Sequence, residues 1–133
     1  MRRTRFDHAQ CPLARTTDLL GDWWTPLVLR ELLLGRRRFA DIQQDLDISK
    51  PILTQRLRRL EDEGIVTRKL YEEHPPRYEY VLTSKGRALW EVAAAMWRYG
   101  DDWLFEDGAL VELVDKRTGE VIEPTVVDAR TGE

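Results

Sequence analysis

The 133-residue chain contains one cysteine, Cys11, only two histidines and no long apolar run. A single thiol excludes an intramolecular disulfide framework and a cysteine-rich zinc site, so we expect no metal and no cofactor. No apolar segment approaches the roughly 20 residues that cross a bilayer, and no apolar stretch follows the basic N-terminus as it would in a signal peptide. The sequence therefore predicts a soluble, cytoplasmic protein that does not bind membranes.

Positive charge is also scarce, with 21 basic against 24 acidic side chains, whereas a nucleic-acid-binding domain is normally basic. The two signs are unevenly distributed, however. Residues 1–99 carry 18 basic and 14 acidic groups, and residues 100–133 carry 3 and 10. We therefore predict two parts: a basic domain over residues 1–108 and an acidic C-terminal tail over residues 109–133.

Apolar residues recurring about every 3.6 positions predict helices over residues 11–21, 25–34, 39–46, 50–63 and from 84 to about 100 or 105. After Gly64 the period falls to two, which predicts strands over 65–71 and 78–83 with a turn at 74–77. Two further strands, 110–114 and 121–127, are expected to form a short hairpin in the tail. Residues 114–120 recur as 127–133 with one substitution, which indicates two like turns.

Helix, short turn, capped helix and hairpin follow one another in the order of a winged helix-turn-helix, an α+β fold that is mainly α. A major groove admits one helix, which needs an apolar side anchored in a core and a polar side facing the bases. The helix over 50–63 has both, because Leu53, Leu57 and Leu60 share one stripe opposite a polar face.

Several stretches occur together in this chain: Cys11–Arg15, Gly21–Thr25, Leu29–Leu32, Arg38–Phe39, Ile48–Ser49, Leu53–Glu61, Gly64–Val66, Pro75–Tyr80 and Leu82–Gly86. In this order and spacing they resemble the HxlR-type winged helix-turn-helix transcriptional regulators over roughly residues 11–100. The resemblance implies a homodimer bound to double-stranded operator DNA, with N- and C-terminal helices pairing across the two-fold axis. In some members of that family a cysteine at the place of Cys11 is a sensor of oxidants, quinones or aldehydes, and the resemblance implies the same candidate role here.

The polar face of the helix over 50–63 predicts the groove contacts Lys50, Thr54, Gln55 and Arg58, with Ser49 and Arg59 nearer to phosphate. Glutamine suits adenine and arginine suits guanine. Arg56 lies closer to the core stripe, so it is either structural or a phosphate contact.

Arg38 and Arg77 are the further DNA contacts that we predict. The cluster Arg36–Arg38 follows a helix C-terminus, where it is equally well explained as a phosphate clamp or as a complement to the helix dipole. In the hairpin, Arg68, Lys69 and Arg77 are either DNA contacts or charges that maintain solubility. Arg77 is the strongest of these, since Pro75 and Pro76 stiffen its turn.

The last predicted helix carries more apolar surface than a small monomer needs. Two adjacent stripes predict the dimer interface: Trp90, Trp97 and Leu104 at heptad spacing, and Leu89, Ala93 and Met96 beside them.

Cys11 is expected at a helix start, where the dipole favours a reactive thiolate; the alternative is a small residue buried near the dimer interface. An enzyme using Cys11 with His8 lacks an orienting group and an oxyanion site, so we expect no enzymatic activity. Trp23 and Trp24 are either core residues or a platform for a planar small-molecule effector.

The sequence thus predicts a dimeric, sequence-specific DNA-binding transcriptional regulator with redox or electrophile sensing as an additional function of Cys11. The alternative is a winged-helix protein-interaction module whose basic face binds an acidic partner. Binding that weakens steeply with salt and depends on base sequence distinguishes the first from the second.

Overall fold

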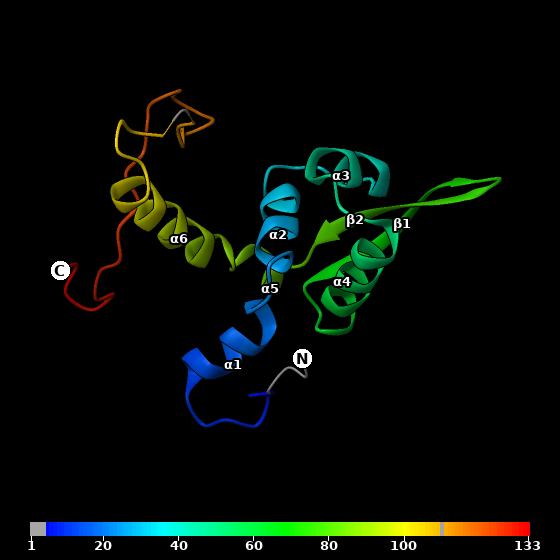
Figure 1. The fold of residues 1–133 in the computed structure, drawn as a ribbon, viewed down its shortest axis with the longest axis horizontal. Helices are drawn as coiled ribbons and strands as arrows, with labels where there is room; N and C mark the ends of the chain where they lie inside the picture. Colours follow the sequence, from blue (N-terminus) through cyan, green and yellow to red (C-terminus); the bar gives the residue numbers. More distant parts are fainter. Residues whose placement is uncertain (1–4, 110) are drawn as a thin grey trace. The chain divides into compact units, whose positions relative to one another are not determined.

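The computed structural model describes residues 5–109 and 111–133, and its backbone forms two compact units that divide between Arg87 and Ala88. The first unit contains α1 (Pro12–Leu20), α2 (Thr25–Leu33), α3 (Phe39–Leu46), α4 (Lys50–Asp62), β1 (Val66–Glu73), β2 (Pro76–Leu82) and α5 (Ser84–Arg87) (Figure 1). The second unit contains α6 (Trp90–Trp103) and the segment that follows it. The predicted order of helices followed by a hairpin is confirmed.

Helix α2 lies at the centre of the first unit and contacts α1, α3, α4 and β2. Its Val28 is fully buried, as are Ile42 of α3 and Leu53 of α4, and Leu57 and Leu60 are 1% exposed. Burial of each such side chain stabilises the fold by about 1.5–3 kcal/mol relative to leaving it in water. The core therefore holds the inner stripe of α4 and fixes which face of this helix remains outside.

The turn between α3 and α4 is fixed by two local features. Asp47 adopts a left-handed conformation with φ 51°, and its N–H donates to the Gln43 carbonyl, which ends α3. Ser49 then caps α4, because its hydroxyl accepts a hydrogen bond from the Ile52 N–H at 3.4 Å. This short, ordered turn sets the angle at which α4 leaves α3.

The hairpin pairs β1 with β2 in antiparallel register, with Val66 opposite Leu82 and Leu70 opposite Tyr78. Its base is joined to the helices by two hydrogen bonds. The Tyr80 N–H donates to the Arg37 carbonyl at 2.7 Å, and the Thr83 hydroxyl donates to the Gly64 carbonyl at 2.6 Å. The turn at its far end contains the His74–Pro75 peptide bond, which is cis. The hairpin thus extends from the body as a wing beside α4 (Figure 1).

Two predictions about the C-terminal part need correction. The single long helix expected from residue 84 is divided by a turn at residues 88–89 into α5 and α6. The tail strands expected over 110–114 and 121–127 do not form in the described residues, where Val114 and Val121 make one isolated bridge. A two-stranded hairpin on its own is marginal in water, and Pro124 cannot donate to a ladder.

The predicted pair of like turns in the tail is confirmed. Gly119 donates its N–H to the Asp115 carbonyl at 2.7 Å, and Gly132 donates to the Asp128 carbonyl at 2.8 Å. In each turn the aspartate side chain also accepts a backbone N–H two residues on, from Arg117 at 2.8 Å and from Arg130 at 2.9 Å. The repeat is therefore a local Asx-turn motif used twice.

Glu31 is a carboxyl group in the interior of α2, with a fully buried side chain. Arg36 donates to its Oε2 at 3.1 Å, whereas Oε1 has no hydrogen-bond partner among the described residues. Burial raises the pKa of Glu31 to about 7, and the neighbouring Asp45 adds to this rise against the opposing charges of Arg36 and Arg30. Protonation of Glu31 removes the negative charge that its burial disfavours.

We predict from this group a pH-dependent stability. The unfolded Glu31 carboxyl titrates near 4.5, so between pH 4.5 and about 7 the folded state binds the extra proton. The free energy of unfolding should therefore fall by roughly 1–3 kcal/mol as the pH rises through this window. The lowered pKa of Asp45 lies below its ordinary 3.8 and acts outside this window.

Urea denaturation at pH 5 and pH 8 measures this difference in the wild type and in Glu31→Gln. The variant should lose most of the pH dependence, while Glu91→Gln, at an exposed position of α6, should retain it. Equal pH dependence in Glu31→Gln and the wild type would contradict the assignment.

Candidate nucleic-acid interface

Helix α4 presents a polar face to solvent opposite its buried leucine stripe. Lys50, Gln55 and Arg58 are exposed on this face, and Thr54 is partly exposed between them. The Lys50 and Arg58 side chains make no hydrogen bond or ion pair with the described residues, so their donors are available. The Thr54 hydroxyl donates to the Lys50 carbonyl at 2.8 Å and keeps its lone pairs as acceptors.

Gln55 is oriented by its neighbour. Its Oε1 accepts a hydrogen bond from Arg56 Nη1 at 2.7 Å, which turns the NH₂ group toward other partners. Recognition of adenine uses both ends of a glutamine amide. Because Oε1 has a second lone pair, it can accept from adenine without releasing Arg56.

Arg56 connects α4 to the start of α2. Its Nε donates to Asp22 Oδ1 at 3.1 Å, and the same carboxylate accepts the N–H groups of Trp24 and Thr25 at 2.9 Å and the Thr25 hydroxyl at 2.5 Å. Burial alone would raise the pKa of Asp22, but these hydrogen bonds outweigh it and lower that pKa. Of the two readings of Arg56, the structure favours the structural one.

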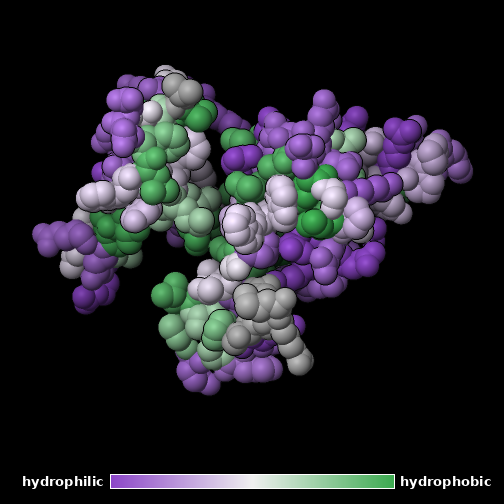
Figure 2. All heavy atoms as spheres, in the orientation of Figure 1, coloured by the Kyte–Doolittle hydropathy of each residue, from purple (hydrophilic) through white to green (hydrophobic). Residues whose placement is uncertain are grey.

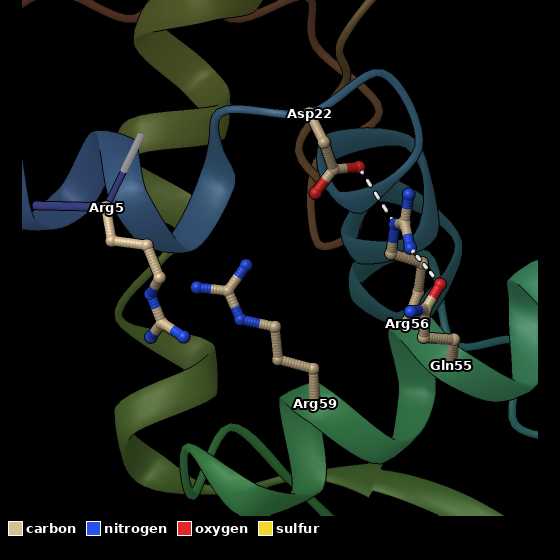
Figure 3. Close-up of a pocket in the computed structure, with 5 residues that line it drawn as sticks. All are labelled: Arg5, Asp22, Gln55, Arg56 and Arg59. Carbon is tan, nitrogen blue, oxygen red and sulfur yellow. Dashed lines mark hydrogen bonds and ion pairs between the residues drawn. The ribbon is translucent and has the colours of Figure 1, made fainter. Parts of the chain in front are cut away.

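Arg59 is held in a similar way one turn further along α4. Its Nη2 donates to the Asp18 carbonyl at 2.8 Å and lies 3.3 Å from Asp18 Oδ2. The phosphate contact that we predicted for Arg59 stays a prediction. The remaining guanidinium nitrogens of Arg59 border a hollow of about 390 Å³. This hollow is lined by Arg5, Asp22, Gln55, Arg56 and Arg59 (Figure 3).

Arg77 lies near the tip of the wing with 57% of its side chain exposed, and it pairs weakly with Glu72 at 3.5 Å. Arg68 instead pairs with Glu61 at 2.8 Å and lies over the Tyr78 ring. Arg77 is therefore freer than Arg68 to reach a ligand beside the wing.

Arg38 is engaged at the base of the wing rather than projecting freely. It lies 3.7 Å from the Glu79 carboxylate, and its guanidinium lies 4.4 Å from the centre of the Tyr71 ring. Arg36 pairs with Glu31, so Arg37 is the member of this cluster whose side chain makes no hydrogen bond or ion pair with the described residues. The DNA contact predicted for Arg38 stays a prediction. It requires the Arg38 side chain to leave Glu79 and Tyr71.

Cys11 is exposed and is the residue immediately before α1, as predicted, with no side-chain capping hydrogen bond. His8 is 96% exposed and lies 3.8 Å from Asp7 rather than pairing with the thiol. Trp23 is 91% exposed, so it is not a core residue. Among the described residues, no group of three His, Cys, Asp or Glu side chains could hold a metal ion.

The second unit leaves much of α6 uncovered. Trp90, Met96 and Leu104 are 41%, 54% and 70% exposed, and Leu89, Ala93 and Trp97 are partly exposed. Apolar side chains gather over α6 in Figure 2, in contrast to the hydrophilic end of the wing. No helix in residues 5–109 and 111–133 is both long and apolar enough to cross a membrane.

Known proteins are similar to this chain in both sequence and fold. The family profile described as HxlR-like helix-turn-helix matches residues 19–107. The uncharacterized HTH-type transcriptional regulator sll1512 of Synechocystis is 44% identical over 111 residues, which are 83% of this chain and 80% of that protein.

Two solved structures extend the comparison. The candidate transcription factor PA1607 superposes with a TM-score of 0.86 at 36% identity over 96% of this chain and 89% of its own. The oxidised redox regulator HypR superposes with a TM-score of 0.63 at 34% identity over 69% of this chain and 96% of its own. The winged helix-turn-helix prediction is confirmed by this agreement.

Sequence reasoning missed the carboxylates that position α4. Asp22 precedes Thr25 by three residues, which is the spacing of a helix-capping aspartate, so this signal was present. Asp18 lies in α1 and its partner Arg59 lies 41 positions later, so no local pattern connects them.

Proposed function

The chain belongs to the HxlR-like helix-turn-helix family of DNA-binding transcriptional regulators, and from this premise we propose that it binds its operator as a homodimer, with α4 in the major groove. The observation that carries the proposal is the outward face of α4, where Lys50 and Arg58 have no partner among the described residues and Gln55 lies between them. The proposed contacts are those predicted from the sequence: Arg38, Ser49, Lys50, Thr54, Gln55, Arg58, Arg59 and Arg77.

The dimer is proposed to form through α6. Its exposed apolar side chains are Trp90, Met96 and Leu104, with Leu89, Ala93 and Trp97 beside them. A contiguous apolar surface of this kind is typical of an interface. Two copies of α4 held by a two-fold axis would meet half-sites separated by about one helical turn of DNA. We propose no catalytic role for Cys11, since the exposed His8 lies 3.8 Å from Asp7 and makes no hydrogen bond to the thiol among the described residues.

Recovery and sequencing of bound genomic fragments tests this function. We expect one recurrent, two-fold symmetric motif to be enriched by the wild type and lost in a Lys50→Ala/Arg58→Ala double variant. Enrichment without a shared motif, together with tight binding of an acidic protein partner, would favour the protein-interaction module instead.

Cys11 supports a further proposal, redox or electrophile sensing. The exposed thiol precedes α1, and one structural neighbour is the redox regulator HypR. Since the chain has no second cysteine, the product must be a mixed disulfide, an adduct or a bridge between subunits.

The prediction is that diamide lowers DNA binding by the wild type and that dithiothreitol restores it. Cys11→Ser should bind DNA normally in reducing buffer and should not respond to diamide. Gel-shift titrations with and without diamide measure both quantities. An oxidant response retained in Cys11→Ser, or absent from the wild type, would contradict the sensing role.

A further inference from the structure

Three arginine side chains from two parts of the first unit surround one hollow. Arg5 comes from the segment before α1, whereas Arg56 and Arg59 come from α4, and Asp22 and Gln55 complete a lining that encloses about 390 Å³. Figure 3 shows Arg59 extending from α4 toward Arg5, with Arg56 turned to Asp22 and Gln55. The hollow therefore lies between the segment before α1 and α4.

Each of the three arginines has a carboxylate beside it, but the pairs differ in strength and exposure. Arg5 and Arg59 share the Asp18 carboxylate, at 3.9 Å and 3.3 Å, and Arg56 lies 3.1 Å from Asp22. The other partner of Arg5 is Asp7 at 3.3 Å, and both of these side chains are substantially exposed. An exposed ion pair of this kind contributes little to stability, so a competing anion can replace Asp7 beside Arg5.

Several donors around the hollow have no partner in residues 5–109 and 111–133. They are Nε and Nη1 of Arg5, Nη2 of Arg56, Nε and Nη1 of Arg59, and the NH₂ group of Gln55. Guanidinium groups match the oxygens of phosphate and carboxylate in geometry and charge. An anion placed between Arg5 and Arg59 would be attracted by both guanidinium charges.

We propose that this hollow binds a tetrahedral oxyanion of the phosphate type, held by Arg5 and Arg59 with Arg56 and the Gln55 amide beside it. The oxyanion comes from one of two sources, a backbone phosphate of bound DNA or the phosphate group of a small free anion. In either case the bound group ties the segment before Cys11 to α4. The DNA source rests on the proposed function, whereas the free-anion source does not.

The test uses the full chain, Arg5→Gln and the control Arg130→Gln, which removes the same charge from the exposed tail. Arg5 is exposed, so its replacement should leave the fold intact. Arg59→Gln is a second variant only, because Arg59 also bonds Asp18 within the first unit. In the first arm, inorganic phosphate is titrated against chloride at equal ionic strength. A free-anion site predicts a saturable rise in Tm of roughly 2–5 °C that is absent from Arg5→Gln and present in Arg130→Gln.

In the second arm, DNA affinity is measured against salt. A backbone-phosphate site predicts that Arg5→Gln weakens binding to all duplexes alike and reduces the salt slope by about 1, with no such change in Arg130→Gln. A neutral methylphosphonate at the contacted position should weaken the wild type and leave Arg5→Gln unchanged. A positive result in either arm supports the site and identifies its source.

Failure in both arms overturns the proposed site. This failure is distinguishable from failure of the proposed function, because sequence-selective binding by the wild type is measured in the same titrations.

Discussion

Replacing Arg58 with alanine is expected to lower affinity for the operator by roughly 5- to 150-fold per half-site. The side chain is exposed on α4 and has no partner among the described residues, so its guanidinium is available for a bidentate contact with guanine. One such contact contributes about 1–3 kcal/mol of discrimination against the wrong base. The variant should therefore lose preference at one base pair in each half-site rather than lose all binding.

Fluorescence anisotropy with the operator and with single-base variants of it measures this effect. Thermal unfolding of Arg58→Ala should match the wild type, because the substitution removes no hydrogen bond or ion pair among the described residues. Arg77→Ala is the matched control: we expect it to weaken all duplexes alike and to reduce the salt slope by about 1. Unchanged operator affinity in folded Arg58→Ala would disprove the assignment of this residue.

Placing a charge on the apolar face of α6 should convert the protein to a monomer. Met96 is 54% exposed, so Met96→Glu leaves the interior of the second unit undisturbed while adding a buried charge to the proposed interface. An uncompensated buried charge costs several kcal/mol, and the two-fold axis introduces it twice. Operator affinity should then fall by about 100-fold or more, since each half-site is bound alone.

Light scattering after size-exclusion chromatography measures the oligomeric state. Ala95→Glu is the control, because Ala95 is exposed and lies on the side of α6 opposite the predicted stripe. This control should remain dimeric and bind the operator. A Met96→Glu variant that stays dimeric would place the interface elsewhere on the chain.

The parts of this fold that local patterns encode could be predicted. Leu53, Leu57 and Leu60 repeat at helical spacing, and the buried side of α4 follows from them. Ser49 at the N-cap and the change of period after Gly64 likewise predicted the start of α4 and the hairpin.

Long-range polar contacts could not be predicted in the same way. For Arg38 the sequence predicts a DNA contact, with a complement to the helix dipole as an equal explanation of its cluster, but the fold brings Glu79 and Tyr71 against it from the wing. The Arg56–Asp22 pair likewise depends on the packing of α4 against the start of α2. These ion pairs join residues that are distant in sequence, so they follow from tertiary packing rather than from periodicity.

The overall charge of −3 argues against DNA binding, whereas the exposed polar face of α4 argues for it. Comparing sequence-specific with non-specific affinity therefore tests whether α4 recognises DNA sequence. With little net positive charge, non-specific affinity should be weak, and the order of bases must supply most of the discrimination. The decisive measurement is a competition gel shift between the selected operator and a scrambled duplex of equal length and composition, repeated over increasing salt. We predict that the operator binds about 1,000-fold or more tightly and that this ratio persists while both affinities fall. Equal affinity for the two duplexes would contradict recognition of DNA sequence by α4.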